Sequence, residues 1–444
     1  MFALFGLATC GGSAVSYTTA CSPGRSVACV GPGACTGYQV CKGDGSGFGP
    51  CSCGLLAVDG GQGADSGRDG AVDVANRSDG SLGDGSVKDS SVSDTNVSDT
   101  RVSDSGVGDS SVGDSTSCDD PGEIVCGGGC VNAQTDAANC GACGHSCIPG
   151  ACSGGVCQPF TLANDPAGIG VLVVLDGRAT WGNYITGEVR TCTIDSCSPT
   201  NFAPGTVTTG CAMDSQNIYW AEQIDTGNVT QCAIGSSCGS PTTLASSQSQ
   251  PWYVVSDSQN VYWTDFVGGT VMMCAIGGCG GNPTVIASGL DSPLGLAVDS
   301  NNLYWTNFSS SGSVMQCAKG GPCSTPTTLA SAQGSPYGIT VDSENVYWAN
   351  QGGDSVMSCA IGGCGENPLT LASGQSGATL VAVDSTDIYW TDAFAGTVMR
   401  CSLPGCGSMT TIASGQQYAF SIALDATRVY WGNQGGGQVM GVAK

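Results

Sequence analysis

The chain has 444 residues, and 36 Asp and Glu against 12 Lys and Arg give it a formal net charge of −24. So few basic residues argue against a nucleic-acid partner, because phosphates are held by Lys and Arg. One histidine, His145, excludes sites that need several histidines. The 28 cysteines are typical of an oxidising compartment.

The first nine residues are apolar, and Cys10 follows them. The segment Leu7-Ala8-Thr9-Cys10 resembles the lipobox of bacterial lipoproteins. That resemblance implies a signal segment at residues 1–9 and a lipid on Cys10, which would anchor the chain without a spanning helix. The alternative is an ordinary secretory signal, with Cys10 in a disulfide. No apolar run is long enough to span a membrane, so we expect membrane contact only through this lipid.

Residues 10–54 form a first Cys-rich module, in which Gly and Pro separate six further cysteines. Such a segment is too short for a stable core and needs disulfides, whose pairing the sequence leaves open. Residues 55–117 contain no cysteine or aromatic residue, and an Asp recurs every five residues from Asp84 to Asp114. This period fits neither a strand nor a helix, so we predict a disordered acidic linker. Calcium binding by the regular Asp residues is the alternative.

Residues 118–157 carry eight cysteines and His145. Their spacing, with Cys126-Gly-Gly-Gly-Cys130 and Cys140-Gly-Ala-Cys143, resembles the Cys-rich module of the stigma-specific family. The resemblance implies an extracellular disulfide knot without catalysis. Zinc binding by these four cysteines is the alternative. We expect four disulfides, with His145 at the surface.

Residues 158–444 are built from repeats. Seven tryptophans recur at intervals of 39 to 43 residues, and six of them follow a tyrosine. Each copy predicts four short strands, A to D, separated by Asp-, Asn- and Gly-rich turns. The sequence therefore predicts an all-β fold, a seven-bladed β-propeller preceded by the small modules and the linker. The last copy lacks strand D, and Pro159-Phe-Thr-Leu-Ala163 matches it, so we expect the first strand to complete the last blade.

Tyr262-Trp263-Thr264-Asp265 and Tyr389-Trp390-Thr391-Asp392 spell the YWTD motif. Residues 158–444 thus resemble the propellers of the low-density-lipoprotein-receptor type, and also the wider NHL-type and streptogramin-lyase-like propellers. The YWTD family has six blades, whereas this sequence predicts seven. The resemblance implies a domain that mainly mediates contacts.

Six copies carry two cysteines five or six residues apart at the C–D turn. This spacing across a hairpin brings the Cβ atoms together and predicts six disulfides. The pairs are Cys192–Cys197, Cys232–Cys238, Cys274–Cys279, Cys317–Cys323, Cys359–Cys364 and Cys401–Cys406. Cys211 replaces an apolar residue of strand A, and we expect it to be a buried free thiol.

A polar residue stands two positions after each blade tryptophan, where strand B enters the B–C turn. Three of these, Glu222, Asp265 and Asp392, are acidic. Trp252, Tyr337 and Phe420 share another repeat position, eleven residues before the blade tryptophan. These six side chains are our candidates for a ligand-binding surface. The alternative is structural: Asp and Asn cap the turns, and the rings pack under neighbouring loops. The Asp residues of the A–B turns are expected to be structural.

Two functions remain open. One is a non-catalytic, extracytoplasmic binding protein at the cell envelope that holds a protein, a peptide or a polysaccharide, with no catalytic residue and no cofactor. The other is a propeller lyase or lactonase that uses a metal ion at the channel mouth. Residues 158–444 contain no histidine, so a metal site there would rest on carboxylates and would suit calcium.

Overall fold

The computed structural model describes residues 26–30, 36–40, 52–53, 118, 120–204, 207–235 and 237–444. The chain divides into two units, residues 1–105 and 106–444. The predicted signal segment, Cys10 and the whole predicted linker lie outside the described residues. In the first unit, β1 (Ser26–Val30), β2 (Thr36–Val40) and β3 (Ser52–Cys53) form an antiparallel sheet.

Residues 118–157 form two hairpins joined by disulfides. The hairpins are β4 (Glu123–Cys126) with β5 (Gly129–Asn132), and β6 (Cys152–Ser153) with β7 (Val156–Cys157). Four disulfides join Cys118 to Cys130, Cys126 to Cys143, Cys140 to Cys152, and Cys147 to Cys157. The cysteines of the zinc alternative are therefore all in disulfides here. Ten disulfides among described residues point to an oxidising, extracytoplasmic environment.

His145 is half-buried rather than open to solvent. Its Nδ1 lies 2.6 Å from the carbonyl oxygen of Cys140, and its Nε2 lies 2.9 Å from that of Lys444. Arg428 also donates to the carbonyl oxygen of Ile148. These contacts join the Cys-rich module to the end of the chain.

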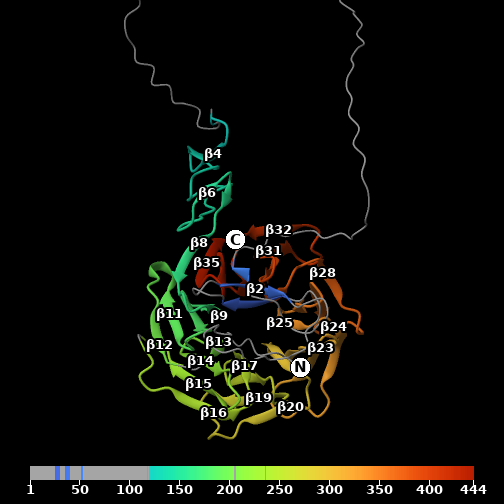
Figure 1. Ribbon diagram of the computed structural model, residues 1–444. Coiled ribbons are helices and arrows are strands. Elements are labelled where there is room, and N and C mark those ends of the chain that lie inside the picture. The colour runs from blue at the N-terminus through green and yellow to red at the C-terminus, as the bar shows by residue number, and fades with distance from the viewer. Residues whose placement is uncertain are drawn as a thin grey trace, which may run out of the picture. The chain divides into compact units, whose positions relative to one another are not determined.

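Residues 160–443 form seven four-stranded antiparallel sheets arranged as a ring (Figure 1). Blade 1 comprises β9 (Ile169–Leu175), β10 (Arg178–Asn183), β11 (Val189–Thr193) and β12 (Thr200–Ala203), with a 3-10 turn at Ile194–Ser196. Blade 2 comprises β13 (Thr208–Met213), β14 (Asn217–Glu222), β15 (Gly227–Ala233) and β16 (Thr242–Gln248). Blade 3 comprises β17 (Pro251–Ser256), β18 (Asn260–Asp265), β19 (Thr270–Ala275) and β20 (Thr284–Ser288).

The remaining blades repeat this order from strand A to strand D. Blade 4 comprises β21 (Pro293–Val298), β22 (Asn302–Asn307), β23 (Gly312–Ala318) and β24 (Thr327–Gln333). Blade 5 comprises β25 (Pro336–Val341), β26 (Asn345–Asn350), β27 (Ser355–Ala360) and β28 (Leu369–Ser373). Blade 6 comprises β29 (Ala378–Val383), β30 (Asp387–Asp392), β31 (Thr397–Ser402) and β32 (Met409–Ala413). Blade 7 comprises β33 (Ala419–Leu424), β34 (Arg428–Asn433), β35 (Gln438–Ala443) and β8 (Phe160–Asn164).

The seven-bladed propeller predicted from the sequence is thus confirmed, including the closing strand. β8 pairs antiparallel with β35, with Gln438 opposite Asn164 and Val439 opposite Ala163, and the two lie side by side in Figure 1. The A strands contact one another around the ring, and β33 meets β9. Closure by β8 gives the seventh sheet its fourth strand, as in the other six blades. No helix of the described residues is long and apolar enough to cross a membrane.

The core lies between the blades, along strand B. All seven blade tryptophans are at most 1% exposed. Strand B is buried on both faces because each blade packs between two others, which explains why its apolar residues do not alternate with polar ones. Between blades, the Thr264, Thr306 and Thr391 hydroxyls donate to the carbonyl oxygens of Leu294, Tyr337 and Phe420 of the next blade. The threonine of the motif therefore joins consecutive blades.

In six of the seven blades a tyrosine precedes the blade tryptophan and fixes the A–B turn of its own blade. In six blades its hydroxyl donates to the turn aspartate, over 2.6 to 3.3 Å. In blade 4 the other oxygen of Asp299 accepts the backbone N–H groups of Asn301 and Asn302. Burial by itself would raise the pKa of Asp299, but these hydrogen bonds outweigh it, and the net effect is a lowered pKa. The expected structural role of these aspartates is confirmed.

The structure joins the six cysteine pairs of the C–D turns as disulfides. Among the cysteines of residues 118–444, Cys211 is free and buried. Burial raises the pKa of its thiol to about 12, so the thiol stays protonated and unreactive.

Candidate functional site

Strand A starts and strand B ends at the same face of the ring. In blade 3, for example, Pro251 at the start of β17 lies opposite Asp265 at the end of β18. We call this face, with its D–A loops and B–C turns, the loop face. The opposite face carries the A–B turns and C–D loops, and we call it the turn face. All six candidate binding residues lie toward the loop face.

In five blades, a side chain at the end of strand D or in the D–A loop accepts the indole N–H of the blade tryptophan. The acceptors are Asp165 for Trp181, Gln248 for Trp263, Gln333 for Trp348, Gln375 for Trp390 and Gln416 for Trp431, at 2.8 to 3.1 Å. Each glutamine stands fifteen residues before its tryptophan. Our sequence analysis did not single out this position, although the repeat spacing was enough to find it.

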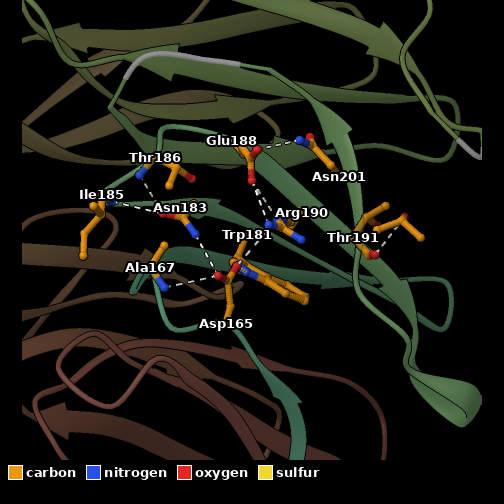
Figure 2. A network of polar contacts seen from close by, with 11 residues as sticks. Asp165, Ala167, Trp181, Asn183, Ile185, Thr186, Glu188, Arg190, Thr191 and Asn201 are labelled. Atoms are coloured by element: carbon orange, nitrogen blue, oxygen red, sulfur yellow. Dashed lines mark hydrogen bonds and ion pairs between the residues drawn. The ribbon is translucent and has the colours of Figure 1, made fainter.

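Blade 1 shows the most extended form of this network (Figure 2). Asp165 follows the closing strand β8 and accepts both the Trp181 indole N–H, at 2.9 Å, and the Asn183 amide, at 2.8 Å. Arg190 lies 3.9 Å from Asp165 and forms a shorter ion pair, 2.8 Å, with Glu188. The closing strand is thereby joined to blade 1 as well as to blade 7.

Asparagines two positions after the tryptophan belong to the same network. The amides of Asn350 and Asn433 donate to Gln333 and Gln416, each at 2.9 Å. The Asn183 oxygen accepts the backbone N–H groups of residues 185 and 186 and so caps its B–C turn. Glu222 is half-buried and accepts a hydrogen bond from Asn228. These polar groups hold turns and loops in place.

Asp265 and Asp392 differ because a carboxyl group occupies the asparagine position. They are 5% and 3% exposed, and each accepts one hydroxyl hydrogen bond, from Thr270 and Thr397. The Oδ1 atom of each is buried without a hydrogen-bond partner. Burial raises the pKa of Asp265 to about 7 and that of Asp392 to about 6. Both groups therefore titrate close to neutral pH.

The three candidate aromatic residues lie at different depths. Trp252 is half-buried, and its ring lies 5.3 Å from that of Phe266 in the same blade. Tyr337 and Phe420 are 8% and 7% exposed and touch each other edge to face, with centroids 5.8 Å apart. They belong to blades 5 and 7, so their contact reaches past blade 6, whose matching residue is Thr379.

Tyr337 and Phe420 form the middle of a longer row of rings, which we call the aromatic row. Its members, from the interior outward, are Phe308, Tyr337, Phe420, Tyr418 and Phe394, with successive centroids 5.5 to 6.4 Å apart. The inner end is buried, whereas Phe394 is 62% exposed. The row thus leads from the packed interior to the surface.

The B–C turns expose further apolar side chains. Ile185, Val267 and Phe394 are each 62% exposed, more than any other large apolar side chain described in the propeller. Each stands four residues after its blade tryptophan. Our sequence analysis missed these residues, and the signal that could have found them is this shared repeat position.

No cluster of three carboxylates or histidines suited to a metal ion occurs among the described residues. The two groups of potential ligands that do come together contain cysteines of the Cys-rich module that are in disulfides. Asp265 and Asp392 stand in blades 3 and 6 and do not belong to any such group.

No protein-family model and no curated protein sequence matches this chain. Solved structures do match. The Staphylococcus aureus virginiamycin B lyase with quinupristin has a TM-score of 0.56 at 13% identity, over 65% of this chain and 98% of that one. The WD40 propeller domain of Doa1 has a TM-score of 0.53 at 12% identity, over 64% and 96%. One chain of a nidogen–laminin complex has a TM-score of 0.44 at 21% identity, over 54% of this chain and 95% of that one. The matches with TM-scores above 0.5 show the β-propeller fold, and fold alone assigns no activity.

Proposed function

We propose that this chain is a non-catalytic, extracytoplasmic binding protein that holds a protein, a peptide or a polysaccharide on the loop face of its propeller. The contact surface would comprise Trp252 and Glu222 with the exposed side chains of the B–C turns. Asp265, Asp392, Tyr337 and Phe420 would support it from beneath.

The exposure of Ile185, Val267 and Phe394 on one face carries this proposal. The three stand in the B–C turns of blades 1, 3 and 6, all on the loop face, where a ligand that spans several blades could contact them together. The tyrosine, tryptophan and threonine of the motif are meanwhile engaged in hydrogen bonds within and between blades. The motif therefore builds the ring, and the turns between strands are left to contact a ligand.

The alternative is a lyase or lactonase with a metal ion at the channel mouth; virginiamycin B lyase shares the propeller fold. The matched structure of that lyase is of a catalytically inactive variant in which alanine replaces a histidine. Residues 158–444 of this chain contain no histidine. A catalytic site of that kind therefore has no counterpart here.

The test is binding of the full chain to glycan and peptide arrays, followed by mass analysis of the recovered ligand. We expect the triple variant Ile185→Ser, Val267→Ser, Phe394→Ser to lose binding. The matched variant Val285→Ser, Leu369→Ser, Met409→Ser changes exposed side chains of the outer strands and should bind normally. A ligand recovered in cleaved or rearranged form would favour the enzyme. Equal binding by both variants would contradict a binding surface at the B–C turns.

We also propose that a lipid on Cys10 anchors the chain to the cell envelope, with residues 55–117 as a spacer. Cys10→Ser should then move the chain from the membrane fraction to the soluble fraction. An unchanged distribution would leave the secretory-signal alternative.

A further inference from the structure

We infer that Asp354, Phe394 and Tyr418 form a site for the cationic side chain of a Lys- or Arg-containing peptide segment of a partner protein. This inference rests on the proposed function and specifies its ligand. It is carried by the local geometry of three neighbouring loops and by the distribution of charge over the propeller.

The D–A loop between blades 5 and 6 brings Asp354 and Phe394 together. Asp354 lies in the B–C turn of blade 5, and its Oδ1 accepts the backbone N–H of Gly377 at 3.2 Å. Gly377 has a φ of +74°, and a Cβ there would overlap the ring of Phe394. The backbone N–H of Ala393, next to Phe394, in turn donates to the carbonyl oxygen of Gly377 at 3.0 Å. A single glycine thus contacts the carboxylate on one side and the ring on the other.

The ring of Tyr418 extends this site toward blade 7. Its centroid is 6.0 Å from that of Phe394, with the two planes tilted by 52°. Tyr418 is half-buried and stacks on the buried Phe420 at 6.4 Å. Tyr418, itself packed on Phe420, therefore supports the exposed ring of Phe394. A guanidinium or ammonium group binds well over such a ring, within about 6 Å of its centroid, when a carboxylate lies beside it.

Buried negative charge lies close behind the exposed carboxylate. Burial is the main cause that raises the pKa of Asp392, and the negative charge of Asp354 raises it further. Asp354 itself is exposed to solvent. A cation at Asp354 would therefore also favour the charged form of Asp392.

The propeller offers this site no cation of its own. Residues 158–444 contain six Lys and Arg. Four of them stand at, or directly after, the turn-face ends of their strands: Arg178, Lys319, Arg428 and Lys444. Arg400 lies within β31, opposite Tyr389. Arg190 alone lies toward the loop face, and it is paired with Glu188 at 2.8 Å. The loop face also carries the exposed carboxylates Asp225 and Asp291. Its charge therefore complements a cationic partner and repels an acidic polysaccharide.

The exposed apolar residues favour a peptide over a small amine. Phe394, Tyr418 and Ile185 belong to the successive blades 6, 7 and 1, so an extended segment could cross all three. An aliphatic residue further along such a segment would cover Ile185. A neutral glycan would stack on the rings and donate hydroxyl hydrogen bonds to Asp354, but it would not need the negative charge of that carboxylate.

The experiment measures binding of the full chain to two synthetic hexapeptides of alternating leucine with either arginine or its neutral isostere citrulline. We expect the arginine peptide to bind at least about tenfold more tightly, with an affinity that falls as salt rises. Phe394→Ala and Asp354→Asn should each weaken it about fivefold or more. The matched variants Val285→Ala, on the outer strand β20, and Glu344→Gln, in an A–B turn of the turn face, should bind as the parent does, and circular dichroism checks that all four fold.

Equal binding of the two peptides would overturn the inference, as would unchanged binding by Phe394→Ala and Asp354→Asn. If spermine binds as tightly as the arginine peptide, the ligand of this site is a polyamine and not a peptide, which also overturns the inference. If neutral glycans bind the loop face and neither peptide does, the inference fails while the proposed function stands. A ligand that is chemically altered would overturn both.

Discussion

Asp265 and Asp392 stand where four other blades carry asparagine. In blade 5 the Asn350 amide donates to Gln333, which also accepts the Trp348 indole N–H. A carboxylate at this position has no proton to donate to the glutamine, but a protonated carboxyl group has one. The raised pKa values of the two aspartates agree with this difference.

We therefore predict that Asp265→Asn and Asp392→Asn stabilise the chain at alkaline pH. The folded-state pKa values, about 7 and about 6, lie above the ordinary 3.8. Stability from these groups is fully present below about pH 4 and is lost as the pH rises through 6 to 7. Each variant should raise the free energy of unfolding at pH 8 by on the order of 1–3 kcal/mol and change it little at pH 4.

Urea unfolding of the oxidised chain at both pH values measures this difference. Asp299→Asn is the matched control, because the pKa of Asp299 is lowered rather than raised. The same gain at pH 4 and pH 8, or a loss at pH 8, would show that the two carboxyls are not held protonated by the fold.

At the scale of the blade, the indole acceptor is missing in blade 4. Leu290 stands fifteen residues before Trp305, at the position of the glutamines, and the Trp305 indole N–H is buried without a partner. The backbone hydrogen bond is nevertheless the same. The backbone N–H of Leu290 donates to the carbonyl oxygen of Gly269, as the backbone N–H groups of Gln375 and Gln416 donate to the carbonyl oxygens of Asp354 and Gly396. Blade 4 thus has the same backbone in its D–A loop but lacks the glutamine side chain that accepts the indole N–H in other blades.

Leu290→Gln should therefore supply the missing hydrogen bond. We expect it to raise the free energy of unfolding by about 1 kcal/mol, the net value of one buried hydrogen bond. Gln333→Leu, which removes the acceptor of both Trp348 and Asn350 in blade 5, should lower it by about 1–3 kcal/mol. Thermal unfolding of the oxidised parent chain and of both variants measures these changes in the free energy of unfolding. A destabilised Leu290→Gln together with an unaffected Gln333→Leu would contradict the structural role of this pair.

Over the whole molecule, the elements that the sequence predicted well are those defined by a repeat. The tryptophan spacing, the aspartates of the A–B turns and the lone strand at Phe160–Asn164 each depend on contacts within one blade or on the need to close the ring. Such contacts recur with the period of the chain. They are therefore visible as a pattern before any coordinates are known.

The candidate site was harder to predict because its contacts join different blades. Gly377 meets Asp354 of blade 5 and Phe394 of blade 6, and the aromatic row joins Tyr337 to Phe420 past blade 6. The depth of each ring also depends on its neighbours: Tyr337 is buried, although it shares a repeat position with the half-buried Trp252. No spacing within one repeat contains this information.

The most direct test of binding at the loop face is hydroxyl-radical footprinting of the full chain, with and without a ligand selected on the arrays. We predict protection of the exposed side chains at Ile185, Val267 and Phe394. Leu369 and Met409, exposed on outer strands, should react equally in both states. Protection confined to the outer strands or to the Cys-rich module, with the B–C turns unchanged, would contradict the account.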